Sequence, residues 1–275
     1  MYSKVYIEIT NICNMRCSFC HGHTRAPRRM TREEFSHVLT ALEGQTKYVY
    51  YHLMGEPLTH PLLPLFLSMA NERGFKSIIT TNGTLIEACG DAILRAGLHK
   101  INLSIHSFEH GSDKDHADYL TALATFAKKA AQCGTIVVFR LWNKGFDHGK
   151  NDGAERLLRE HIPGEWKESP RSIRLRERIF LEHGERFEWP DLAESIKGER
   201  FSCYGLKDQF GILADGTVVP CCLDSEGVIA LGNIFFEDVD AILTSERARA
   251  IAEGFRCGKA SEELCRRCGY ARRFV

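Results

Sequence analysis

Short runs of apolar and β-branched residues alternate with longer stretches of mixed polarity over the first two thirds of the chain. The short runs predict strands at residues 5–10, 48–53, 76–81, 100–105, 135–141 and 173–180. The longer stretches are amphipathic or polar and of helical length, and they predict helices at residues 32–42, 62–73, 85–96, 115–132 and 154–161. Alternation of this kind is typical of parallel strands joined by helical crossovers. We therefore expect an α/β fold, either an open doubly wound sheet or an incomplete barrel.

The last third of the chain has a different pattern. The periodicity weakens after Pro190, and "DQFGILADGTVVPCC" predicts two short strands around a turn at Asp215–Gly216. A helix is predicted at residues 238–253, followed by a cysteine-bearing tail. We place a boundary between residues 185 and 200, which gives one module at 1–190 and a smaller one at 191–275.

Composition and charge narrow the class of protein. The 275 residues are 44% hydrophobic, and 36 basic residues balance 36 acidic ones, so no net charge draws the chain to nucleic acid or to an anionic membrane. No long apolar segment and no secretory signal are visible, so we expect a cytoplasmic protein. Eleven cysteines in that compartment point to metal ligation or thiol chemistry, because the cytosol keeps disulfides reduced.

Three of the cysteines follow the first predicted strand in the spacing C-x3-C-x2-C, at Cys13, Cys17 and Cys20. In a parallel barrel this position is the mouth where active sites form. A structural zinc site needs four ligands, and His21 or His23 could supply the fourth. An iron–sulfur cluster held by only three thiolates would instead keep an open iron. The spacing alone leaves both alternatives open.

The segment "ITNICNMRCSFCHG" closely resembles the cluster motif of the radical S-adenosylmethionine enzymes, including Phe19 before the last cysteine. The resemblance implies a partial (β/α)6 barrel and a [4Fe-4S] cluster whose open iron binds S-adenosylmethionine. It further implies reductive cleavage of that cofactor to a 5′-deoxyadenosyl radical, with an electron donor such as flavodoxin or ferredoxin. By the same resemblance, residues at the ends of successive predicted strands contact the cofactor. These are Gly55 and Glu56 in "LMGEP", where Met54 replaces a glycine, Asn82 in "TTNGT", Ser104 and Arg140.

A second set of cysteines, Cys203, Cys221, Cys265 and Cys268, supplies four thiolates from two distant segments. A zinc ribbon is one interpretation. The surrounding sequence resembles the SPASM or twitch extension of certain radical enzymes, which implies a small α+β module with one auxiliary [4Fe-4S] cluster. In layout the chain resembles 2-deoxy-scyllo-inosamine dehydrogenase, an alcohol-oxidising enzyme of this type, and also the larger peptide-modifying enzymes.

The remaining cysteines have no assigned role. Cys222 could replace Cys221 as a ligand, donate hydrogen to a substrate radical, or simply be buried. Cys257 is unexplained, and Cys89 and Cys133 are predicted to lie in the core.

These features predict a two-electron oxidation, such as dehydrogenation of a small-molecule alcohol, with the auxiliary cluster as electron acceptor. One alternative is a peptide maturase or an epimerase that uses Cys222, and another is a non-catalytic zinc-binding interaction protein. Met1 lies a few residues before the first strand, so we expect no leader-binding domain and favour a small molecule or a separately delivered peptide. Candidate bases are numerous and none is assigned: His52, His106, Glu182, Asp208 and Asp224.

Overall fold

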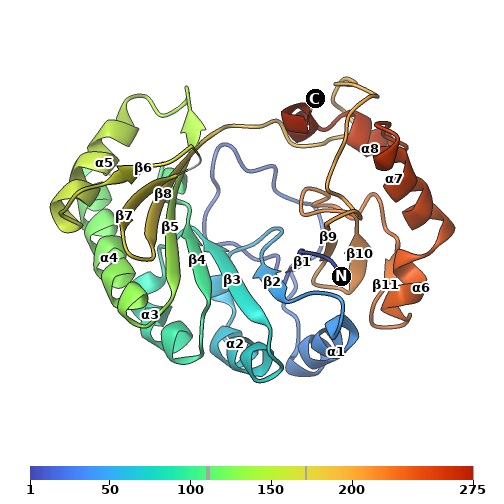
Figure 1. The fold of residues 1–275 in the computed structure, drawn as a ribbon, viewed down its shortest axis with the longest axis horizontal. Helices are drawn as coiled ribbons and strands as arrows, with labels where there is room; N and C mark the ends of the chain where they lie inside the picture. The colour runs from blue at the N-terminus through green and yellow to red at the C-terminus, as the bar shows by residue number, and fades with distance from the viewer. Residues whose placement is uncertain (110–111, 171, 275) are drawn as a thin grey trace.

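A single curved sheet of eleven strands organises the computed structural model, which describes residues 1–109, 112–170 and 172–274. The strand order is β11-β10-β9-β1-β2-β3-β4-β5-β8-β7-β6. Figure 1 shows the sheet bent into an open arc with helices α1 to α5 along its outer side. The expected incomplete barrel is therefore confirmed.

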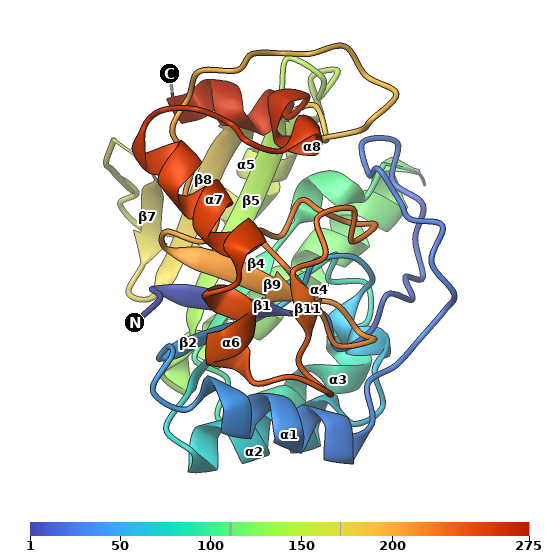
Figure 2. The same ribbon diagram turned by 90° about the vertical axis from the view of Figure 1, so that its right-hand side faces the viewer.

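Seven neighbouring strands of the arc run parallel. They are β1 (Lys4–Ile7), β2 (Tyr48–Tyr51), β3 (Lys76–Thr81), β4 (Lys100–Leu103), β5 (Ile136–Lys144), β8 (Ile179–Glu185) and β9 (Gln209–Ile212). The carboxyl ends of parallel strands meet at one edge of a sheet, so the segments that follow β1 to β5 converge there. Figure 2 shows the long loop after β1 (blue) at the side of the sheet opposite the N-terminus.

The crossover helices begin and end close to the predicted residues. They are α1 (Arg32–Leu42), α2 (Leu63–Glu72), α3 (Ile86–Arg95), α4 (Asp113–Gln132) and α5 (Lys150–His161). α1 begins at a capping box, because the Thr31 hydroxyl accepts from the Glu34 amide while the Glu34 carboxylate accepts from the Thr31 amide. Short 3-10 turns follow β2 and β4, as η1 (Pro57–Thr59) and η2 (Ile105–Ser107).

One predicted strand is wrong. Residues 173–180 contain β7 (Ile173–Arg176), a turn and the start of β8. β7 pairs antiparallel with β8 and with the short β6 (Lys167–Glu168). The turn is made by Arg178 at a φ of 62°, a conformation that non-glycine residues seldom adopt. The sixth parallel strand is therefore β8, which begins six residues later than predicted.

The last third continues the same sheet. The predicted turn at Asp215–Gly216 joins β9 to β10 (Thr217–Val219), and β11 (Gly232–Asn233) completes this edge. The predicted helix at 238–253 is two helices, α6 (Val239–Leu243) and α7 (Glu246–Arg256), because the Ser245 hydroxyl caps a new helix. The chain ends in α8 (Glu263–Arg266) and η3 (Gly269–Phe274).

Alternation along β1 divides the molecule into an apolar and a polar side. Val5, Ile7 and Ile9 belong to the large core between the sheet and its helices. Lys4, Tyr6 and Glu8 point the other way, into the arc, where Tyr6 and Leu53 belong to a separate small cluster. In the described ranges, no helix combines the length and apolar character needed to cross a bilayer.

Candidate active site

The three N-terminal cysteines lie together in the loop that follows β1. The Cys20 amide donates to the Cys17 carbonyl at 3.1 Å, and the Cys17 sulfur lies 3.7 Å from the carbonyl oxygen of Ser107, the last residue of η2. Burial raises the pKa of Cys17 to about 12, and the charges of Glu109, Cys20 and Cys13 add to that shift. Three thiols this close destabilise one another's ionised forms until a cation or cluster compensates them.

Neither histidine next to this motif joins the thiols. His23 Nε2 lies 2.8 Å from the Asn11 carbonyl oxygen, while His21 stacks on Trp189 and lies 3.8 Å from an Asp191 oxygen. No group of three or more His, Cys, Asp or Glu side chains in the described ranges is placed to hold a single metal ion. With neither histidine beside them, the three thiols fit a cluster that leaves one iron open.

Glu56, predicted to contact the cofactor, ties two strand ends together. Its carboxylate is buried and accepts from the Leu58 amide at 2.9 Å, the Thr81 hydroxyl at 2.7 Å and the Asn82 amide at 2.8 Å. Burial raises the pKa of Glu56, while these hydrogen bonds lower it. The Glu56 amide also donates to the Ile12 carbonyl, so this residue fixes the cysteine loop against the end of β2.

Asn82 extends the same network toward the cysteine motif. Its amide nitrogen donates to the Asn14 side-chain oxygen at 3.0 Å, and Asn14 donates to the Thr84 hydroxyl at 2.9 Å. Ser104 immediately precedes η2, and its carbonyl accepts from the Ser107 hydroxyl at 2.6 Å. These predicted contacts therefore gather at one edge of the sheet, and a role for them in cofactor binding stays a prediction.

Gly55 allows the two loops to approach. It has a φ of 74°, and a Cβ there would lie 2.3 Å from the Thr10 carbonyl oxygen. Gly55→Ala should therefore push the cysteine loop away, and its left-handed backbone alone costs about 1–2 kcal/mol. We expect the alanine variant to melt earlier than wild type and to lose affinity for S-adenosylmethionine, as measured by thermal denaturation and equilibrium dialysis.

Gly44→Ala is the matched control. Gly44 also has positive φ, at 80°, yet a Cβ at this position would meet no other group of the described ranges within 4 Å. Gly44→Ala should lower the stability only by the cost of the left-handed backbone and leave the affinity for S-adenosylmethionine unchanged. Equal affinities in the two alanine variants would contradict the close approach described here.

Phe19 lines a smaller cavity of about 170 Å³ beside the cysteine loop. Its ring lies 4.9 Å from the His106 ring, and its carbonyl accepts from the Trp189 indole at 3.0 Å. This hydrogen bond holds Trp189 to the cysteine motif.

Arg140 lies apart from the other predicted cofactor contacts. Its side chain lines a cavity of about 310 Å³, together with Tyr6, Tyr50 and His52. Neither the cysteines of the first motif nor Gly55, Glu56, Asn82 or Ser104 line that cavity. Arg140 forms an ion pair with Glu182, with 3.5 Å between Arg140 Nε and Glu182 Oε2.

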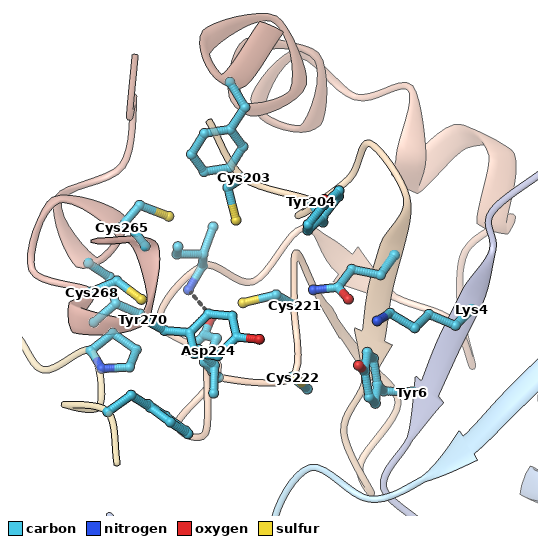
Figure 3. Close-up of a pocket in the computed structure, with 18 of the residues that line it drawn as sticks. Lys4, Tyr6, Cys203, Tyr204, Cys221, Cys222, Asp224, Cys265, Cys268 and Tyr270 are labelled. Atoms are coloured by element: carbon cyan, nitrogen blue, oxygen red, sulfur yellow. Dashed lines mark hydrogen bonds between the residues drawn. The ribbon is translucent and has the colours of Figure 1, made fainter. Parts of the chain in front are cut away.

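The second set of cysteines meets at the other end of the same cavity. Cys203 precedes β9, Cys221 follows β10, and Cys265 and Cys268 lie on and after α8. Figure 3 shows the four sulfurs facing a common space. Burial, followed by the charges of the neighbouring thiols, raises the pKa of Cys221 well above its ordinary value. Four thiols around one space fit an auxiliary iron–sulfur cluster.

The two adjacent cysteines have different surroundings. Cys221 lies with the other three sulfurs, whereas Cys222 lies toward Tyr6 (Figure 3), whose hydroxyl hydrogen-bonds to it and thereby lowers the pKa of the thiol. Burial has the opposite and larger effect on that pKa. Cys257 is exposed and bonds to Glu253, outside the cavity. Cys133 is exposed at the end of α4, so its prediction as a core residue is wrong.

Residues 7–144, half of the chain, match the family model of the radical SAM superfamily. The chain belongs to the radical SAM superfamily. Residues 203–269 match the SPASM model, an iron–sulfur cluster-binding domain. This radical SAM protein is therefore an enzyme whose cofactors are S-adenosylmethionine, the [4Fe-4S] cluster that binds it, and an auxiliary iron–sulfur cluster. The alternative of a non-catalytic zinc-binding protein is thereby wrong.

Curated radical SAM relatives include GTP 3′,8-cyclases. The enzyme of Chlorobaculum tepidum is 32% identical over 109 residues, which are 38% of this chain and 33% of that protein. The chain thus matches about a third of the length of that relative. A probable GTP 3′,8-cyclase of Methanothermobacter marburgensis is 22% identical over 263 residues, covering 81% of this chain and 85% of the relative.

Solved structures share the fold. BtrN in complex with AdoMet and 2-DOIA superposes with a TM-score of 0.62 at 18% identity, covering 98% of this chain and 93% of BtrN. SuiB of Streptococcus suis bound to S-adenosylmethionine gives 0.63 at 18% identity, with coverages of 98% and 72%. anSMEcpe with bound AdoMet gives 0.63 at 14% identity, with coverages of 97% and 88%.

Several residues that line the cavity were missed from the sequence, and two of them lie on the first strand. Lys4 and Tyr6 point into it from β1. The signal was present in "KVYIEI", because strand alternation puts residues 4, 6 and 8 on the face opposite Val5 and Ile7.

Proposed function

We propose that this enzyme oxidises a small molecule by two electrons, as in the dehydrogenation of an alcohol, within the cavity between the barrel and the C-terminal module. In this proposal Cys13, Cys17 and Cys20 hold the cluster that binds S-adenosylmethionine. The auxiliary [4Fe-4S] cluster is held by Cys203, Cys221, Cys265 and Cys268. One observation carries the proposal: the four auxiliary thiols and the side chains inside the barrel line the same cavity.

When bound, S-adenosylmethionine and its cluster supply a 5′-deoxyadenosyl radical, which removes one hydrogen atom from the substrate. The auxiliary cluster supplies an acceptor for the substrate's second electron. The chain's own contribution is to enclose and orient the substrate. Trp142, Phe187, Phe201 and Leu264 line the cavity and exclude water. The remaining proton leaves the substrate hydroxyl for solvent or a base, and His52 is neutral at physiological pH because burial lowers its pKa to about 3.

The test uses reconstituted enzyme with S-adenosylmethionine, reductant and a metabolite extract of the source organism, with GTP added as a separate candidate. We expect one metabolite to lose the mass of two hydrogens in proportion to the 5′-deoxyadenosine formed. Cys268→Ala should still form 5′-deoxyadenosine but not the oxidised product, whereas Cys257→Ala, which alters an exposed thiol, should behave as wild type.

A second candidate is epimerisation with Cys222 as the hydrogen donor, favoured by its position beside Tyr6 in the cavity. It would leave the substrate mass unchanged in ordinary water and add one deuteron in heavy water. If the wild-type enzyme gave that result and Cys222→Ala did not, epimerisation would be the activity in place of the oxidation proposed here.

A further inference from the structure

The barrel end of the cavity is built from alternate positions on three parallel strands. Lys4 and Tyr6 come from β1, Tyr50 and His52 from β2 and the residue after it, and Arg140 from β5. Because side chains at every second position share one face of a sheet, all of them point into the arc. Figure 3 shows Lys4 and Tyr6 reaching from β1 toward the space that the auxiliary cysteines border.

Lys4 brings a positive charge with no acidic partner. No carboxylate in the described ranges forms an ion pair with its ammonium group, which lies instead 5.7 Å from the Tyr6 ring centre and 5.9 Å from that of Tyr50. These aromatic faces attract a cation weakly but do not neutralise it. A charge held this way remains available to a ligand.

Arg140 brings a second charge that is only partly compensated. Its guanidinium stacks over Trp142, with 4.6 Å between Cζ and the ring centre, and it is mostly buried. Glu182 is its ion-pair partner, but the 3.5 Å between Nε and Oε2 is too long for a well-formed hydrogen bond. A planar guanidinium with unused donors suits a carboxylate or phosphate, which can accept two parallel hydrogen bonds.

The acidic side chain that lines the cavity, Asp224, forms no ion pair with either cation within the described ranges. Both carboxylate oxygens of Asp224 accept from backbone amides, Val228 at 2.9 Å and Ile229 at 2.8 Å. His52 adds a neutral donor or acceptor: its buried Nδ1 makes no hydrogen bond within the described ranges, and burial, followed by the nearby cations, lowers its pKa. The barrel end therefore carries an excess of positive charge and unused hydrogen-bonding groups.

We propose that Lys4 and Arg140 bind a carboxylate or phosphate group of the substrate, with His52, Tyr6 and Tyr50 as neutral hydrogen-bonding partners. The inference rests on the proposed function in taking this cavity as the substrate site, and it specifies the class of substrate as a small anion. It disfavours a cationic substrate such as an aminocyclitol, because two like charges would face its ammonium group.

The test is calorimetric titration of the reconstituted enzyme with S-adenosylmethionine and no reductant, at fixed ionic strength. The probes are pyrophosphate, malonate and, as a cation, ethylenediamine. We expect one of the anions to bind and ethylenediamine not to bind. The comparison of pyrophosphate with malonate shows whether the site recognises a phosphate or a carboxylate. Lys4→Met should weaken anion binding about tenfold or more, and Lys4→Arg should restore much of it.

Lys47→Met is the matched control, since it removes the same charge from an exposed position just before β2. Arg140→Gln combined with Glu182→Gln removes the second cation without leaving an unpaired carboxylate, and it should also weaken binding. The proposal is overturned if neither anion binds better than ethylenediamine, or if Lys4→Met and Lys47→Met have equal affinities.

A redox titration distinguishes anion binding from the other role open to these cations, which is to tune the potential of the auxiliary cluster. If Lys4→Met shifts the potential of the auxiliary cluster and leaves anion affinity unchanged, the cations serve the cluster and the proposal is wrong. Because no turnover takes place in the titration, failure of the proposed oxidation leaves the binding result intact, and failure of anion binding leaves the oxidation intact.

Discussion

Cys17→Ala will abolish the reductive cleavage of S-adenosylmethionine, with 5′-deoxyadenosine formation falling to the level of the reaction without enzyme. The reason is that the first motif offers three thiols and the structure places neither His21 nor His23 with them as a fourth ligand. Two thiolates cannot retain a cluster that normally takes three or four. Anaerobic reconstitution should yield about eight irons per wild-type chain and about four per mutant chain, since the auxiliary site remains.

Cys133→Ala is the control for this experiment, because its thiol is exposed at the end of α4 and distant in sequence from both motifs. It should keep the full iron content and activity. If Cys17→Ala retained wild-type iron and wild-type 5′-deoxyadenosine formation, the loop after β1 would not be the cluster site.

The barrel was predictable because its strands obey simple periodicity. β3 (Lys76–Thr81) and α1 (Arg32–Leu42) have the predicted bounds, the latter because a capping box marks its start. The hairpin of β7 and β8 was not predictable, because Arg178 occupies a left-handed turn position with none of the usual glycine or asparagine signal. An uninterrupted β-type run therefore predicts one strand where the chain makes two.

The choice between Cys221 and Cys222 was also beyond the sequence. Adjacent residues after a strand face opposite sides, and which side carries the other three thiols depends on how α8 and the segment before β9 return to the cavity. That return is a long-range feature that no local pattern encodes. In the structure it favours Cys221 as the ligand, and Cys222 lies toward Tyr6.

Arg140 shows a further limit of strand-end reasoning. The sequence places it near the end of β5, and resemblance then suggests a cofactor contact. β5 extends to Lys144, however, so Arg140 lies inside the barrel and lines the cavity shared with the auxiliary cysteines. The predicted end of the strand at residue 141 is therefore three residues short, and the role of Arg140 as a cofactor contact stays a prediction.

The second large effect is expected at the contact that joins the cysteine loop to the C-terminal module. Arg25 Nη2 donates to both oxygens of Glu8, each at 2.7 Å, and its Nε donates to the Ser225 carbonyl at 2.8 Å. The Glu8 side chain is fully buried and that of Arg25 is 14% exposed. Thr24 adds hydrogen bonds to Glu226, so the loop is bound to the segment that follows Cys222.

Arg25→Met should lower the free energy of unfolding by about 3–5 kcal/mol, because it leaves the Glu8 carboxylate buried without its cation. For a chain of this size that corresponds to a melting temperature lower by about 6–20 °C. Adding Glu8→Gln should restore much of the loss by removing the unpaired charge. Arg256→Met, which breaks an exposed ion pair with Glu253, should show no measurable change.

The loss of stability in Arg25→Met should depend on pH, and its direction should identify the Glu8 carboxylate as the source of the loss. Burial raises the pKa of the Glu8 carboxyl, and Arg25 opposes that shift, so the pKa rises further in Arg25→Met. A folded-state pKa above the unfolded value means that stability is present while the group is protonated and is lost as pH rises. The destabilisation should therefore be larger near about pH 8 than near about pH 5, as followed by calorimetry at both. A loss of equal size at the two pH values, or one that Glu8→Gln does not relieve, would place its origin in the Arg25 contact to Ser225 and not in the buried ion pair.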